Sequence, residues 1–560
     1  MNPLKLALVI TVMSVVVGCD DPRCVDDDSC PTDTPFCDLE AGGVCVIALV
    51  VGEGEGEGEG EGEGEGEGEG EGEGEGEGEG EGEGEGEGEG EGEGEGEPDH
   101  ALVFAPTDPP ALGGAVDVDD SGRIWMVGDI GGKVTFSPEG VVLGAIVPGN
   151  GVTNYGFALR LGPDLVPQLA TAPELSFSNF AVTDVAALDD GAVVVGQLFR
   201  EFSFAGCTFS QSDQAPNTGG FILVLDGAGA CTASAYIASP AGSGGKGGAA
   251  GLQVSVAPDG SVFVTGQVSG ASSRVEGTPP TPIVDSSGEV AGAVDRTSNR
   301  LFFCAGFDAG LVHRFSFSTI RPLFVDAGGG RVVVSGAAHG TEGVNDAVLP
   351  GALGESGVFA IDLDPISGAT SGVRFVGSGV STDPIVVAVA ASDQASVAVG
   401  AFDSIFLETN ARGRPAGFVV VVAEDGVVTS LTLVGACESP IVTVTDVAFD
   451  DVGGVVISGF SVCSTLTLAD GTTVELSAGP DTGRDFVMRL DGSLAVRSSR
   501  AFESAFDGSI ASQTAPSLGS VVGGRVVIGG TTAGPLPLAA GTTRTIGSGA
   551  SLFVADLALP

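Results

Sequence analysis

One pattern recurs seven times between residues 113 and 529 and constrains the fold more than any other feature of the sequence. Each copy contains an apolar segment, a turn rich in Asp or Gly, and a short apolar run that ends in glycine. The closing glycines lie 59 to 70 residues apart. A fixed period of this length indicates a structural unit that buries its apolar faces against neighbouring copies. The seven copies are 113–128, 182–196, 251–266, 321–336, 385–400, 444–459 and 514–529.

A second apolar run follows each copy, as in GFILVLD from Gly220 and DFVMRLDG from Asp485. Val and Phe dominate these runs, and Gly, Asp, Asn and Pro bound them, which is typical of β-strands. No stretch shows the sustained 3.6-residue apolar period of an amphipathic helix. The repeat therefore predicts an all-β fold whose unit has two hairpins, or about four strands.

Short and wholly apolar runs such as Val193-Val194-Val195 indicate strands that are covered on both faces. Four-stranded sheets stacked face to face around an axis satisfy this requirement and form a β-propeller. Residues 101–105 precede the first copy and are candidates to close the ring by pairing with residues 551–557. We predict a seven-bladed β-propeller over residues 100–560. Six or eight blades, or a right-handed β-helix, are the alternatives.

The best-preserved copies also carry a family resemblance. Val444–Gly459 with Asp485–Gly492, and Val182–Gly196 with Gly220–Gly227, are the best matches to the alternation D-x-x-G-x-V-x-V-x-G followed by D-x-F-V-x-x-L-D-x-x-G. The repeats thereby resemble the bacterial β-propeller-repeat family of the seven-bladed type, over residues 98–560. The resemblance implies an exported protein that is often anchored by lipid and that rarely has an assigned activity.

The amino terminus predicts export. In residues 1–18, Lys5 precedes an apolar run from Leu6 to Val17, which is too short to span a bilayer and suits a secretory signal. The run ends in Val16-Val17-Gly18-Cys19, which resembles the bacterial lipobox, whose cysteine is acylated and becomes the first mature residue. We predict a lipoprotein signal peptide at 1–18 and lipidation of Cys19. An ordinary signal peptide with Cys19 in a disulfide is the alternative.

The predicted location is the cell envelope, with the lipid anchor in a membrane. We expect the outer membrane or the cell surface. Asp20 and Asp21 resemble an inner-membrane retention signal, so retention at the inner membrane is the alternative.

Residues 46–99 contain an unbroken Gly-Glu alternation from Gly52 to Glu97. Such a segment cannot bury apolar surface, and repulsion between its carboxylates extends it. We predict a disordered acidic linker, which either serves as a stalk or is a tolerated repeat. The net charge of the whole chain is −54, and this excludes nucleic acid as a partner because phosphate binding needs a clustered positive surface.

The ten cysteines fall into two groups. If Cys19 is acylated, four remain in residues 19–45, which we predict to be a small Cys-rich stub with two disulfides whose pairing stays open. A zinc site is the alternative, but the stub has no His and no Cys-x2-Cys pair. Among the later cysteines, proximity within the repeats suggests one pair within the second repeat, one joining the fifth to the sixth, and a buried free thiol at Cys304. The disulfide candidates are Cys24, Cys30, Cys37, Cys45, Cys207 with Cys231, and Cys437 with Cys463.

The sequence offers no catalytic, cofactor-binding or metal-ligating residues by motif. His100, His313 and His339 have no second His or Cys at metal-ligand spacing, and no nucleophile elbow or phosphate-binding glycine loop occurs. Residues 117–122 begin like a calcium loop, but Gly128 occupies the twelfth position, so we predict a hairpin turn there.

These features predict a non-catalytic binding or adhesion module that acts through loops at one end of the ring. Its partner would be an envelope or extracellular protein or a glycan, and no cofactor is implied. A propeller-type glycan hydrolase is the enzyme alternative, because carboxylates are abundant, although only Trp125, Tyr155 and Tyr236 supply Trp or Tyr. A structural surface spacer without a ligand is the third reading.

Overall fold

The computed structural model describes residues 36–38, 44–46 and most of 100–559. The longest gaps in the last range are 105–113, 144–154, 210–218, 238–247, 270–280 and 504–515. In the described residues every regular element is a β-strand. The signal peptide, the lipidation site Cys19 and nearly all of the Gly-Glu linker lie outside them. Residues 21–97 form a unit separate from the repeats, and its described part is an antiparallel pair of β1 (Phe36–Asp38) and β2 (Val44–Val46).

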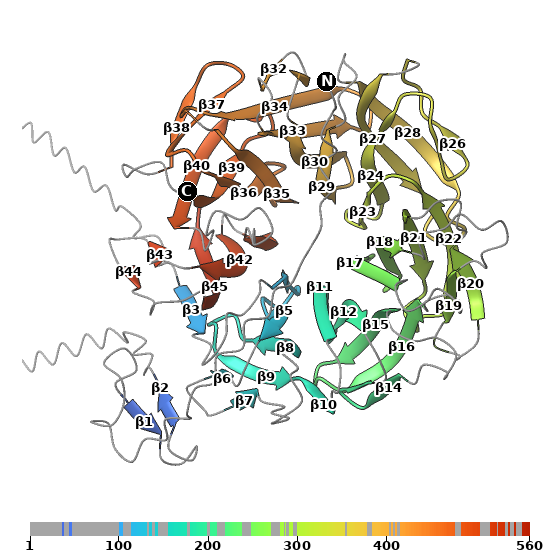
Figure 1. Ribbon diagram of the computed structural model, residues 1–560, viewed down its shortest axis with the longest axis vertical. Helices are drawn as coiled ribbons and strands as arrows, with labels where there is room; N and C mark the ends of the chain where they lie inside the picture. Colours follow the sequence, from blue (N-terminus) through green and yellow to red (C-terminus); the bar gives the residue numbers. More distant parts are fainter. Residues whose placement is uncertain are drawn as a thin grey trace, which may run out of the picture. The chain divides into compact units, whose positions relative to one another are not determined.

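The repeats form seven four-stranded antiparallel sheets that follow one another in sequence order around a common axis, as Figure 1 shows. In blades 1 to 6, the first strand of each repeat lies nearest the axis, and the second, third and fourth strands follow it outward. Blade 1 is β4 (Val116–Val118), β5 (Ile124–Ile130), β8 (Tyr155–Leu161) and β9 (Pro167–Thr171). Blade 2 is β11 (Phe180–Leu188), β12 (Gly191–Leu198), β15 (Gly219–Asp226) and β16 (Cys231–Ile237). Blade 3 is β17 (Gly248–Val256), β18 (Val262–Ser269), β21 (Arg300–Phe307) and β22 (His313–Thr319).

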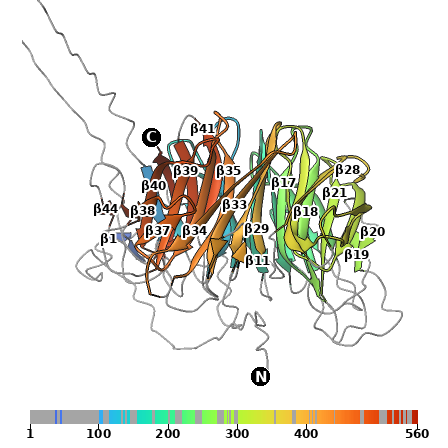
Figure 2. The same ribbon diagram turned by 90° about the horizontal axis from the view of Figure 1, so that it is seen from above.

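The remaining sheets continue the same order, and Figure 2 shows neighbouring blades stacked with their strands side by side. Blade 4 is β23 (Leu323–Asp326), β24 (Val332–His339), β27 (Ser356–Leu363) and β28 (Thr370–Gly377). Blade 5 is β29 (Ile385–Ala391), β30 (Ala395–Phe402), β33 (Ala416–Ala423) and β34 (Val428–Gly435). Blade 6 is β35 (Val442–Phe449), β36 (Val455–Ser461), β39 (Arg484–Leu490) and β40 (Val496–Glu503).

Blade 7 combines both ends of the repeat region and closes the ring. It contains β41 (Ser517–Val522), β42 (Arg525–Thr532), β45 (Ser551–Ala558) and, as its outermost strand, β3 (His100–Phe104). Ala101 lies opposite Ala555 and Leu102 lies opposite Val554. The predicted closure by residues 101–105 is therefore confirmed, as are the all-β class and the seven blades.

The structure corrects the number of hairpins in each unit from two to three. A short hairpin occupies the connection between the second and third strands of every blade. The hairpins of blades 3 and 6 pair with the outermost strand of the preceding blade, β16 and β34, and extend those sheets to six strands. This covers sheet edges that would otherwise present unpaired backbone groups.

The hairpin of blade 2 is joined by a further short strand, β10 (Pro173–Leu175), which pairs with β13. In blade order, the seven hairpins are β6 (Val134–Phe136) with β7 (Val141–Leu143), β13 (Phe202–Phe204) with β14 (Cys207–Phe209), β19 (Thr281–Val284) with β20 (Val290–Val294), β25 (Gly343–Val344) with β26 (Ala347–Val348), β31 (Ile405–Phe406) with β32 (Thr409–Asn410), β37 (Thr465–Leu468) with β38 (Thr473–Glu475), and β43 (Leu536–Pro537) with β44 (Thr543–Arg544).

The core lies between successive blades. In the run predicted to be covered on both faces, Val193 and Val195 pack with Leu252 of blade 3, whereas Val194 packs with Trp125 of blade 1. All three valines are fully buried. Alternate residues of one strand thus join two different clusters, which explains why this strand is apolar without interruption.

The closing glycine of each repeat has a specific packing role. In six blades it lies on the second strand directly opposite a fully buried Phe of the third strand. At Gly400, an added Cβ would collide with the backbone carbonyl oxygen of Ile385 and would lie 3.0 Å from Cε1 of Phe418. The glycine therefore makes room for both the first strand and the aromatic ring. The pairs are Gly128–Phe157, Gly196–Phe221, Gly266–Phe303, Gly336–Phe359, Gly400–Phe418 and Gly459–Phe486.

Candidate binding face

The antiparallel blades place two kinds of connection at opposite ends of the ring. Turns between the first and second strands, and between the third and fourth, lie at one end, which we call the turn face. The longer connections between blades and between the second and third strands begin at the other end, and many of them lie outside the described residues. The turn face is therefore the end whose side chains the structure places.

Aspartate side chains fix the turns of this face. In blade 3, Oδ1 of Asp308 accepts hydrogen bonds from the backbone N–H groups of Gly310 and Val312, both at 2.9 Å. Leu311 has a φ of 61°, and its side chain is fully buried. This is a short hairpin turn that ends in a left-handed residue. The turns at Asp226 and Asp491 are built in the same way, with the left-handed residue being Gly229 and Leu494.

The residue after the left-handed position is exposed in every turn between third and fourth strands. It is Val or Ala in strict alternation through blades 1 to 6, and the three valines are 39%, 47% and 58% exposed. Blade 7 has no such turn because its fourth strand comes from the other end of the repeat region. We call these residues the aliphatic array: Val166, Ala230, Val312, Ala369, Val427 and Ala495.

Arginines of the turn face link neighbouring blades. Nη1 of Arg489 donates to the carbonyl oxygen of Leu559 in blade 7 at 3.0 Å, while its Nε pairs with Asp450 at 3.0 Å. Nη1 of Arg314 in blade 3 donates to the carbonyl of Pro365 in blade 4 at 3.3 Å. These positive charges are thus engaged with carbonyl groups and carboxylates of the ring itself.

A second set of acidic residues lies on the innermost strands. Each of these strands is a sheet edge, whose N–H groups need partners outside their own sheet. Carboxylates supply them across blade junctions, as Asp117 accepts from the N–H of Ala187 at 2.7 Å and Asp184 accepts from that of Val254 at 2.9 Å. At the junction of blades 3 and 4 the hydroxyl oxygen of Ser255 takes this role and accepts from the N–H of Ala327 at 2.9 Å. We call the four aspartates and this serine the inner belt, which joins five of the seven junctions: Asp117, Asp184, Ser255, Asp326 and Asp446.

Burial changes the acidity of the inner belt. It raises the pKa of Asp184 to about 8 and the pKa values of Asp117 and Asp446 to about 6, because the charged form loses hydration. The other carboxylates of the belt add to the effect, and the backbone hydrogen bonds oppose it. At neutral pH, Asp184 therefore holds a proton that a free aspartate would release.

We expect the free energy of unfolding to fall as the pH rises from 5 toward 8.5. The pKa of Asp184 is higher in the folded than in the unfolded chain, so its stabilisation is complete below the unfolded value and is lost as pH rises through about 8. The loss should be on the order of 1–3 kcal/mol for this half-buried group. Urea titrations at pH 5, 7 and 8.5 measure it. Asp184→Asn should flatten the slope, Asp120→Asn should leave it unchanged, and stability that rises from pH 5 to 8.5 would contradict the expectation.

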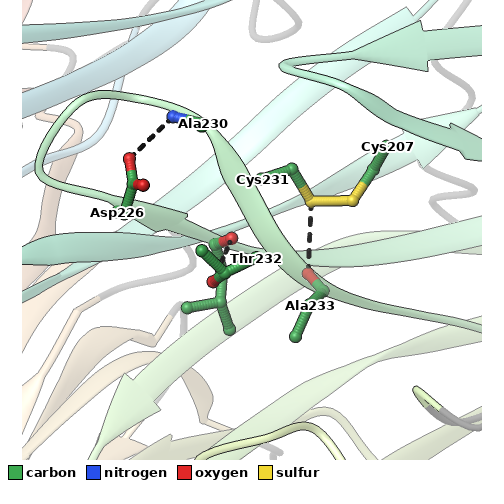
Figure 3. The surroundings of a disulfide bond; sticks show 7 residues. Cys207, Asp226, Ala230, Cys231, Thr232 and Ala233 are labelled. Carbon is green, nitrogen blue, oxygen red and sulfur yellow. Dashed lines mark hydrogen bonds between the residues drawn. A yellow bond between two sulfur atoms is a disulfide. The ribbon is translucent and has the colours of Figure 1, made fainter.

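The structure brings together the later cysteines in the suggested pairs. Cys207 of β14 is joined to Cys231 of β16, and Figure 3 shows this disulfide beside the turn in which Asp226 accepts a hydrogen bond from Ala230. Cys437 is joined to Cys463, which links the end of blade 5 to the connection that leads into β37. Cys304 is a buried free thiol on β21.

The remaining predicted site residues are not brought together with these. Cys37 lies opposite Cys45 in the β1–β2 hairpin, whereas Cys19, Cys24 and Cys30 are outside the described residues. His100, His313 and His339 lie on β3, β22 and β24, in three different blades. Within the described part of the chain, no three His, Cys, Asp or Glu side chains are arranged to hold a metal ion.

The hairpin turn predicted at residues 117–122 is present. Oδ1 of Asp119 accepts from the N–H of Ser121 at 2.9 Å and from that of Arg123 at 3.0 Å, and Gly122 has a φ of 79°. Asp117, by contrast, belongs to the inner belt, a role that the sequence analysis missed. The only signal for the belt was the recurrence of Val-Thr-Asp-Val at 182–185 and 444–447.

No protein-family model matches the sequence, and no characterised protein matches it either. Among solved structures, the chain is similar to a Dos1 propeller, with 10% identity, a TM-score of 0.32, and coverage of 81% of this chain and 95% of that one. A streptogramin B lyase has 9% identity and a TM-score of 0.26 over 64% and 94% of the two chains. The rhamnogalacturonan lyase YesW has 10% identity and a TM-score of 0.26 over 81% and 91%. At these scores the likenesses carry no argument about activity.

Proposed function

We propose that this protein is a bacterial envelope lipoprotein whose propeller is a non-catalytic binding or adhesion module. The observation that carries the proposal is the turn face, where six blades present the same kind of exposed aliphatic side chain on turns fixed by hydrogen bonds. A rigid ring that repeats one surface element suits recognition rather than chemistry at a single point.

The inner belt favours binding over hydrolysis. A glycan hydrolase needs two carboxyl groups that can contact the glycosidic bond and a water or sugar carbon. In Asp184, however, Oδ1 accepts from the N–H of Val185 and Oδ2 from that of Val254, both at 2.9 Å. Asp117 is engaged in the same way with Val118 and Ala187. These carboxylates serve the blade junctions, and their raised pKa values follow from burial there.

The location in the envelope rests on the amino-terminal pattern and on the disulfides. Two disulfides within the ring suit an extracellular or envelope compartment, since thiols stay reduced in the cytosol. Residues 1–18 and Cys19 would supply the signal peptide and the lipid anchor, as the resemblance to the bacterial β-propeller-repeat family implies. Among the described residues there is no helix long and apolar enough to cross a membrane.

The function is tested by applying the full chain to glycan and protein arrays and measuring which spots it binds. A parallel assay measures the release of reducing sugar from envelope polysaccharide. A Cys19→Ala variant, which should release no fatty acid on acid hydrolysis, supplies a lipid-free chain that should bind the same spots as the lipidated protein. Array binding without sugar release supports the proposal. Sugar release would favour the hydrolase, and the absence of any binding would favour a structural spacer. Fatty acid released from Cys19→Ala would refute the anchor.

A further inference from the structure

We propose that the turn face docks a basic protein segment that carries aliphatic side chains between its cationic ones. This inference rests on the proposed binding function and names the surface and the chemistry of the partner.

Six of the large aliphatic side chains that are exposed in the described residues lie at or beside turns of the turn face. Ile366 is 67% exposed and lies before the array residue Ala369 in the same turn. Val452 is 75% exposed and lies in the turn between β35 and β36, where its N–H donates to Asp450. Together with the array valines they occupy blades 1, 3, 4, 5 and 6. Single exposed aliphatics are ordinary, but Val166, Val312 and Val427 recur at one structural position in blades 1, 3 and 5, which gives a partner three equivalent contacts. The set is Val166, Val312, Ile366, Val427, Val428 and Val452.

The charge of the same face selects a cationic partner. Asp120, Asp189, Asp393 and Glu424 are exposed in these turns, and their side chains make no hydrogen bond or ion pair with any described residue. The arginines nearby are already engaged, as Arg489 with Asp450 shows. A surface with unpaired carboxylates between aliphatic tips is complementary to a chain that alternates Lys or Arg with aliphatic residues. An anionic lipid surface would be repelled.

The construction of the turns reduces the cost of binding. Leu165, Leu311 and Leu494 are buried although they adopt left-handed backbone conformations, so each anchors its turn. Leu311 packs in the cluster between blades 2 and 3, and Leu494 in the cluster between blades 5 and 6. The aliphatic residue that follows is thereby held outward before any partner arrives. A preorganised surface loses little conformational entropy when it binds.

The test uses the full chain and a fluorescent probe peptide of about twelve residues that alternates Lys and Val. Lys-Ser and Glu-Val peptides of the same length are the comparison probes. Fluorescence anisotropy gives the Kd at low and at physiological salt. The turn variant is Val166→Ser/Val312→Ser/Val427→Ser. The matched control is Ile320→Ser/Val348→Ser/Ile385→Ser, whose side chains are 55%, 71% and 63% exposed and lie away from these turns. Equal melting temperatures show that both variants fold.

We expect the wild type to bind the Lys-Val probe more tightly than either comparison probe, and more weakly as salt rises. The turn variant should weaken this binding about tenfold, since it removes three aliphatic contacts, whereas the control should match the wild type. Asp120→Asn/Asp189→Asn/Asp393→Asn should weaken binding most at low salt. Absence of binding to Lys-Val, equal binding of Glu-Val, or equal losses in both serine variants would overturn the inference. If the turn variant still binds the array ligands of the wild type, the proposed binding function stands, but the turn face is not the surface that performs it.

Discussion

Gly400→Ala is expected to lower the free energy of unfolding by about 3 kcal/mol, because a methyl group would be forced into a fully packed strand junction. The added Cβ meets the carbonyl oxygen of Ile385 on the first strand and the ring of Phe418 on the third. Relief requires the first strand to move away from the second, which would disturb the packing of blade 5 against its neighbours. Urea denaturation at pH 5 measures the loss.

Gly492→Ala is the matched control. The nearest atom to an added Cβ there is the carbonyl oxygen of Gly453 at 3.8 Å, so we expect a change within about 0.5 kcal/mol. Because the first clash at Gly400 involves backbone, trimming the aromatic ring with Phe418→Ala should add to the loss and should not rescue it. Equal stabilities of Gly400→Ala and Gly492→Ala would show that the closing glycine is not required for packing.

The pairing of glycine with phenylalanine illustrates what the sequence does and does not reveal. The glycines were visible as the ends of the repeated runs, and the strands containing Phe221 and Phe486 were visible as the second runs. Their register was not, because the two strands of a pair are separated by a connection of variable length, such as 199–218 in blade 2. Only the pairing of the two strands in the structure shows that the recurring glycine and the recurring phenylalanine lie directly opposite each other.

The third hairpin of each blade was missed for a different reason. Its strands are two to five residues long, as in β38 with Thr473, Val474 and Glu475, and too short for an alternating pattern to stand out. The hairpins of blades 3 and 6 are held by the sheet edges with which they pair. Leu466 of β37 is fully buried through its pairing with β34 of the preceding blade, a contact that no local pattern contains.

The turn face was predicted only in outline. Aspartate and glycine marked the turns correctly, since both residues favour turn conformations. Leu311 and Leu494, however, read as ordinary core residues, because left-handed backbone usually selects glycine. Burial of the leucine side chain outweighs that preference here. The position of the exposed residue that follows, and so the aliphatic array, depends on this tertiary effect.

Leu102→Asp is expected to cost about 4 kcal/mol of unfolding free energy and to open the ring, because it places a charge in the strand that closes blade 7. Leu102 is 8% exposed and pairs with Val554, which is fully buried. Since β3 is the one strand of blade 7 that comes from the amino-terminal side of the repeats, its loss removes the pairing that unites the two ends of the chain.

Thr473→Asp places the same charge at an exposed position of β38 and should leave stability within about 0.5 kcal/mol of the wild type. Small-angle X-ray scattering then separates local damage from opening, because only an opened ring increases the radius of gyration. Ala101→Cys/Ala555→Cys tests the same closure from the opposite direction, since these residues face each other across β3 and β45. A disulfide between them should restore a compact ring when combined with Leu102→Asp. If Leu102→Asp unfolds at the same urea concentration as Thr473→Asp, β3 does not hold the ring closed.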